Sequence, residues 1–167
     1  VGVNAGNTTQ GTNAVAIGSG AGQTTQGANN VAIGPSAGNN GQLAGAVAIG
    51  NLAGNLTQGA GAVAMGQGAG RFTQGASAVA IGTDAGRGVS GVSFQGDNAI
   101  AIGNLAGATS QTAGSIALNA SGLALDPANA GFYVDPVRND SSGNALVYNT
   151  TTKEITYGAA AASSLAD

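Results

Sequence analysis

Cysteine, histidine and tryptophan are absent from this chain of 167 residues, and only 7% of its residues are charged. Without cysteine there is no disulfide framework, and without histidine there is neither a Ser-His-Asp or Cys-His catalytic group nor a typical zinc site. The net charge of −3 is small and unclustered, which argues against a nucleic-acid partner. No apolar run reaches the ~20 residues of a membrane helix, and no signal peptide is visible. We therefore expect no enzyme activity, cofactor, metal site or membrane insertion.

The chain contains 31 glycines, so a flexible linker is the first alternative to consider. A repeated phrase argues against it: NAVAIG at 13–18 returns six more times in related forms. The step is sixteen residues, except for one of twenty-one between Ile81 and Ile102. Val1-Gly2 fits sixteen residues before Ile17-Gly18, so we expect the chain to begin inside an eighth copy, as a fragment or a processed product. Such a period is typical of a stacked solenoid.

Side chains alternate along a strand, so VAIG has a bulky face and an alanine face. We expect the bulky face to form a core ladder inside the solenoid: Val15, Ile17, Val31, Ile33, Val47, Ile49, Val63, Met65, Val79, Ile81, Ile100, Ile102, Ile116 and Leu118. We expect the alanine face, which permits close approach, to lie between chains: Ala16, Ala32, Ala48, Ala64, Ala80, Ala101 and Ala117.

A glutamine recurs five residues before each VAIG phrase, next to a second short strand expected around Thr24–Ala28 and its equivalents. The glutamines either form an amide ladder along the column or cap turns, and the ladder is favoured. They are Gln10, Gln26, Gln42, Gln58, Gln74, Gln95 and Gln111. Two short strands and two turns make one coil, and coils stack in parallel at ~4.8 Å. Because each coil offers only two large aliphatic side chains, we expect a single column to need neighbours, as in a trimer.

The phrases NAVAIG, SAVAIG and NAIAIG resemble the head repeat of YadA-type trimeric autotransporter adhesins. The resemblance covers residues 1–122. It implies a left-handed parallel β-roll that packs as a threefold bundle. The fold expected is therefore all-β, a parallel β-solenoid of sixteen-residue coils, with 1–122 as its repeat domain.

Composition changes at Leu123, and residues 123–158 are expected to form a separate C-terminal β-hairpin module. Strands are predicted at 131–138, 145–149 and 154–158, the last two as a hairpin. The string GFYVDPVRNDSSGNALVYNTTTKEITYG resembles a module of structural and fibre-like proteins of giant algal and amoebal viruses and of marine phages. Residues 159–167 are interpreted as a linker or tail. Tyr133 and the other aromatic residues here are expected to pack, with stacking on sugars as the alternative.

Residues 87–94 (RGVSGVSF) carry the five extra residues of the irregular copy. Extra residues in a solenoid form a loop, and loops often carry specificity. Arg87, Val89, Val92 and Phe94 are therefore candidates for a contact loop, the alternative being a tolerated insertion.

Together these features predict a non-enzymatic fibrous attachment protein, extracellular on a virion or cell surface. Its expected partner is itself, as a homotrimer, with end-to-end polymerisation and a host receptor or glycan left open. A viral or phage fibre is favoured over the head of a bacterial trimeric adhesin, and a glycan-binding module is a third interpretation.

Overall fold

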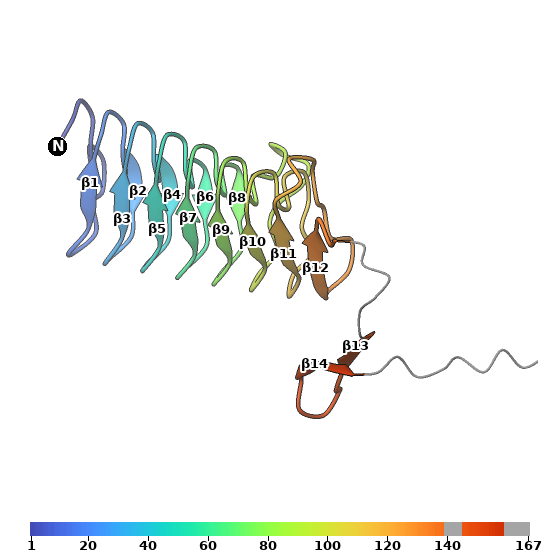
Figure 1. The fold of residues 1–167 in the computed structure, drawn as a ribbon. Helices are drawn as coiled ribbons and strands as arrows, with labels where there is room; N and C mark the ends of the chain where they lie inside the picture. The colour runs from blue at the N-terminus through green and yellow to red at the C-terminus, as the bar shows by residue number, and fades with distance from the viewer. Residues whose placement is uncertain (139–144, 159–167) are drawn as a thin grey trace, which may run out of the picture. The chain divides into compact units, whose positions relative to one another are not determined.

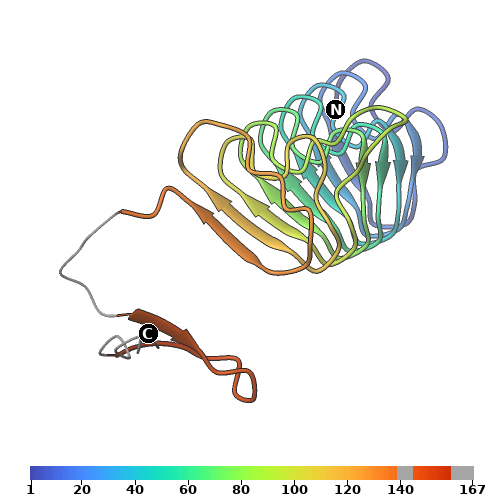
Figure 2. The ribbon, with the colours of Figure 1, turned by 90° about the vertical axis from the view of Figure 1, so that its right-hand side faces the viewer.

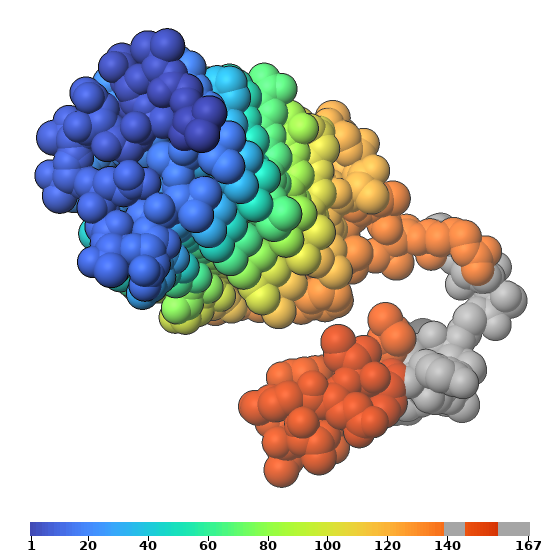
Figure 3. Space-filling view, turned by 90° about the vertical axis from the view of Figure 1, so that its left-hand side faces the viewer, coloured from blue at the N-terminus to red at the C-terminus, as the bar shows by residue number. Residues whose placement is uncertain are grey.

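The computed structural model describes residues 1–138 and 145–158, which divide into two compact units on either side of the Pro136–Val137 bond. The first unit is a parallel β-solenoid, as the sixteen-residue period predicts (Figure 1). Its coils follow one another in chain order and are in direct contact along the column (Figure 3).

One side of every coil contributes a strand to a long parallel sheet. VAI triplets supply four of these strands and related triplets three more, because β-branched side chains favour extended backbone. Equivalent residues pair directly, Val15 with Val31 and Val31 with Val47, so the register is the repeat itself. The eight strands, in spatial order, are β1 (Val15–Ile17), β3 (Val31–Ile33), β5 (Val47–Ile49), β7 (Val63–Met65), β9 (Val79–Ile81), β10 (Ile100–Ile102), β11 (Ile116–Asn119) and β12 (Phe132–Asp135).

A short parallel sheet lies on another side of the coils (Figure 2). Its strands are β2 (Thr24–Gln26), β4 (Asn40–Gln42), β6 (Thr57–Gln58) and β8 (Thr73–Gln74). Single bridges extend this row at both ends, from Gln10 to Gln26 and from Gln74 through Gln95 to Gln111. The recurring glutamine therefore occupies the same place in each of these coils.

Two glycine positions close each coil because a side chain fits at neither. Gly18 has φ +123°, and a Cβ there would lie 2.6 Å from the carbonyl carbon of Gly34 on the next coil. Gly22 has φ +51°, and its Cβ would lie 2.5 Å from Oε1 of Gln26. Glycine adopts such positive φ values without strain. The recurring glycines thus set both the turn and the close stacking of coils.

The interior is lined by alanine, which corrects the prediction for the two strand faces. The side chains predicted to lie between chains are buried inside the coil instead: Ala16, Ala32, Ala48, Ala64, Ala80, Ala101 and Ala117. In all of these copies but the last, the alanine five positions later, such as Ala53, joins them. The predicted core ladder points outward and is half-buried or exposed: Val15, Ile17, Val31, Ile33, Val47, Ile49, Val63, Met65, Val79, Ile81, Ile100, Ile102, Ile116 and Leu118.

The width of the coil explains this reversal. The Gln58 Nε2 of the short sheet lies 2.8 Å from the carbonyl oxygen of Val47 in the long sheet. Two sheets that a single glutamine can span leave room between them for methyl groups but not for branched side chains. The alternation identified the two faces correctly, and coil width decided which one lies inside.

The solenoid also extends further along the chain than the predicted boundary at residue 122. Strand β12 pairs in parallel with β11, with Phe132 opposite Ile116 and Val134 opposite Leu118. Residues 123–135 therefore form a last coil of the column, and the separate C-terminal unit begins at Val137.

That second unit contains the hairpin predicted from the sequence. Strands β13 (Ala145–Tyr148) and β14 (Ile155–Gly158) pair antiparallel, with Tyr148 opposite Ile155. The turn is held by Asn149, whose Oδ1 accepts hydrogen bonds from the backbone N–H groups of Thr151 and Thr152. Leu146 and Tyr148 are exposed on it, at 75% and 55%. The predicted tail at 159–167 lies outside the described residues.

Candidate functional site

The outward side of the long sheet carries two large apolar side chains on each of its eight strands, and we call these residues the apolar face. One row runs from Val15 to Phe132 and the other from Ile17 to Val134, in register from coil to coil. Ile17, Ile102 and Val134 are 44%, 40% and 42% exposed. A monomer rarely exposes a continuous apolar patch of more than a few hundred Å² unless the patch binds something. This face is the first candidate site.

A ladder of buried glutamines supports the apolar face from the inside. The side-chain Nε2 of Gln42 donates to the carbonyl oxygens of Val31 and Ala46, both at 3.0 Å. Equivalent bonds recur at Gln58, Gln74, Gln95 and Gln111. Each amide therefore ties the short sheet to the strand that displays the apolar face.

Contacts between successive glutamines are present in three pairs. Nε2 donates to Oε1 of the next coil from Gln26 to Gln42 at 3.3 Å, from Gln58 to Gln74 at 3.2 Å and from Gln95 to Gln111 at 2.9 Å. Gln10 differs from the others because it is exposed, and its amide donates to the Ala14 carbonyl at 3.1 Å. The glutamines therefore stack inside the column as three bonded pairs rather than as the continuous amide ladder expected from the sequence, and most of their other bonds go to backbone carbonyls.

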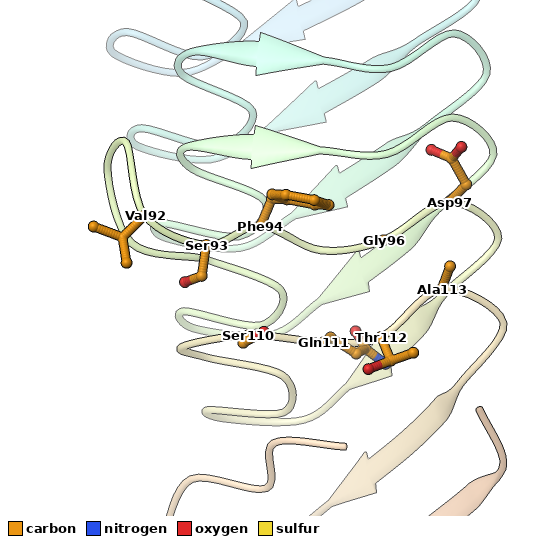
Figure 4. A pocket seen from close by; sticks show the side chains of 9 residues that line it. All are labelled: Val92, Ser93, Phe94, Gly96, Asp97, Ser110, Gln111, Thr112 and Ala113. Carbon is orange, nitrogen blue, oxygen red and sulfur yellow. The ribbon is translucent and has the colours of Figure 1, made fainter. Parts of the chain in front are cut away.

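The irregular copy forms a second candidate site, on the side of the short sheet. The extra residues make a tight loop in which the N–H groups of Val92 and Ser93 donate to the Val89 carbonyl, each at 3.0 Å. Val92 is 80% exposed and Phe94 57%. A pocket of about 360 Å³ lies beside them, between this coil and the next (Figure 4).

The structure places the four candidate loop residues in two different surroundings. Val92 and Phe94 line the pocket, whereas Arg87 and Val89 do not. Arg87 lies at the preceding corner, where its Nη1 is 3.6 Å from Oδ2 of Asp84. Pocket residues that the sequence did not single out include Asp97, Ser110 and Thr112, which come from positions where most other copies carry different residues.

The last coil closes the end of the solenoid. Tyr133 lies opposite Ala117, in the position that alanine fills in every earlier strand, and is half-buried. Pro127, sixteen residues after Gln111, is fully buried in place of the glutamine. Leu125 of this coil bridges to Ala106 and packs against the alanine core, so the last coil covers the end of the interior, as terminal repeats do in solenoids.

No group of three or more acidic, cysteine or histidine side chains that could hold a metal gathers in the part of the chain that the structure describes. Within residues 1–138 and 145–158 there is also no helix that could span a membrane.

The fold and its faces define the chain as a parallel β-solenoid repeat protein. Comparisons with protein-family models, with curated proteins and with solved structures give no match. Any more particular function must therefore be argued from the faces of this solenoid.

Proposed function

We propose that this protein is a non-enzymatic fibrous attachment protein whose columns assemble side by side as a homotrimer. The observation that carries the proposal is the apolar face: the largest side chains of the repeat lie outside the coil and are half-buried or exposed. Alanine burial alone contributes little hydrophobic free energy, since a methyl group is worth roughly 0.8 kcal/mol. The alanine interior therefore supplies only a small part of the hydrophobic free energy of folding. Packing of the apolar face against copies of the same chain supplies the larger part.

A threefold arrangement suits a face two residues wide. The Val47 row of one column can pack against the Ile49 row of the next, and the third column closes the ring. The likeness of the VAIG repeats to YadA-type heads supports the same bundle and a left-handed winding. In such a bundle the short sheet faces outward, so the loop at 87–94 stays accessible.

The setting proposed is the surface of a virion, as part of a fibre. The likeness of residues 131–158 to modules of viral and phage structural proteins favours this setting over the head of a bacterial adhesin. The mechanism is mechanical: stacked coils at ~4.8 Å form a rigid spacer that holds an attachment surface away from its support.

Electron microscopy of the purified full chain tests this proposal. Class averages should show short rods with three lobes in cross-section, and the variant Ile49→Asp should lose them because it places a charge in the apolar interface. The matched change Thr57→Asp, on the exposed side of the short sheet, should leave the rods intact. Single-lobed particles for the unmodified chain would contradict the assembly.

A further inference from the structure

The pocket beside the irregular loop combines side chains that the repeat does not require. The outward position before the glutamine holds Thr25, Thr57 or Thr73 in other coils, whereas this coil has Phe94. The repeat does not require an aromatic ring at this position, and Phe94 is 57% exposed. Phe94 is therefore a candidate contact residue.

Polar groups surround this ring on two successive coils. Asp97 lies on the same coil as Phe94, and Ser110 and Thr112 lie on the next one (Figure 4). The Asp97 carboxylate is oriented, because its Oδ1 accepts a 2.8 Å hydrogen bond from the Ala76 N–H. The carboxylate therefore points toward the preceding coil, and Asp97 lies at the edge of the pocket (Figure 4). The pocket itself combines one exposed ring with two hydroxyl-bearing side chains, Ser110 and Thr112.

We infer that this pocket binds a neutral sugar ring, and the inference rests on the attachment role proposed above. A pyranose has an apolar face of C–H groups, which covers an aromatic ring, and an edge of hydroxyl groups, which exchange hydrogen bonds with hydroxyl side chains such as those of Ser110 and Thr112. The pocket volume of about 360 Å³ lies in the range of small-molecule sites. The Asp97 charge repels acidic sugars, so neutral ones are the chemical class that fits.

The pocket stays open in the proposed trimer. Gln95 and Gln111, which flank it, belong to the row of the short sheet, whereas the apolar face is on the long sheet. Three copies of the pocket would then surround the column, and multivalent contact raises the avidity of a weak single site.

The test uses the full chain and a panel of methyl glycosides of neutral hexoses and N-acetylhexosamines, with a sialoside as the acidic comparison. Saturation-transfer NMR measures the binding of each glycoside. At least one neutral glycoside should bind more tightly than the sialoside. The variant Phe94→Thr installs the residue that other coils carry, so it should fold, yet it should weaken binding at least about tenfold. Asp97→Asn keeps the bond to Ala76 but removes the charge, so it should reduce the preference for neutral glycosides over the sialoside. Thr57→Ala is the control and should bind as the unmodified chain does.

Unchanged binding in Phe94→Thr, tighter binding of the sialoside, or no binding of any neutral glycoside at millimolar concentration would each overturn the inference. A native mass measurement on the same samples separates this failure from that of the proposed function. A chain that assembles but binds no sugar refutes only the sugar site, whereas a chain that does not assemble refutes the trimer.

Discussion

The side-chain Nε2 of Gln58 donates a 2.8 Å hydrogen bond to the carbonyl oxygen of Val47, across the inside of one coil. The same amide donates to the Ala62 carbonyl at 3.2 Å and to Oε1 of Gln74 at 3.2 Å. One buried side chain therefore links the two sheets and two neighbouring coils. Since Val47 displays its own side chain on the apolar face, the interior ladder holds the surface that we propose for assembly.

Replacing this amide should destabilise the column. Gln58→Ala removes the hydrogen bonds of its amide to Val47, Ala62 and Gln74 and opens a cavity, so we expect the free energy of unfolding to fall by about 2–4 kcal/mol. Gln10→Ala is the matched control, because Gln10 is exposed and its amide bonds to Ala14 alone. Chemical denaturation followed by circular dichroism measures both. Equal losses in the two variants would show that the buried ladder has no special role.

The interior alanines should tolerate no enlargement. Ala48 is fully buried at 0% exposure, and Ala48→Leu forces a branched side chain into a space already filled by glutamine and alanine. We expect loss of the folded column or a fall of at least about 3 kcal/mol in its stability. Thr57→Leu, on the exposed side of the short sheet, should leave the thermal midpoint within a few degrees. If the Ala48→Leu variant melts at the same temperature as the unmodified protein, alanine does not line the core.

The period and the strands were predictable from the sequence, but the inward face and the last coil were not. VAIG alternation assigns Val47 and Ala48 to opposite faces without saying which is inside, because that depends on the distance between the sheets. The recurring glutamine is the sequence feature that could have indicated the inward face. An amide that is buried in every coil, as Gln42 is, needs carbonyl partners within reach, and this requires the two sheets to lie close together. The last coil keeps the sixteen-residue step from Ile116 to Phe132, but its aromatic residues conceal the repeat.

Only the loop side of the pocket could be predicted from the sequence, because the other side depends on how the coils stack. The irregular spacing marks the loop, so Val92 and Phe94 stand out in the sequence. Ser110 and Thr112 do not stand out in the sequence, because only the stacking of coils brings them beside the loop.

Two truncated chains should behave differently because of the last coil. A chain ending at Gly122 lacks β12 and Tyr133, so it exposes the edge of β11 and the alanine interior, and we expect it to aggregate. A chain ending at Pro136 keeps that coil and should remain soluble. Size-exclusion chromatography with light scattering compares them. A soluble, well-ordered 1–122 chain would show that the last coil is not a cap.

The mass of the full chain in native solution tests the central claim, assembly through the apolar face, most directly. Native mass spectrometry should give three times the chain mass of 15.6 kDa, and the Ile49→Asp variant should give the single chain mass with its strand content retained. A mass of 15.6 kDa for the unmodified protein at micromolar concentration, or an unchanged trimer in the Ile49→Asp variant, would contradict the account.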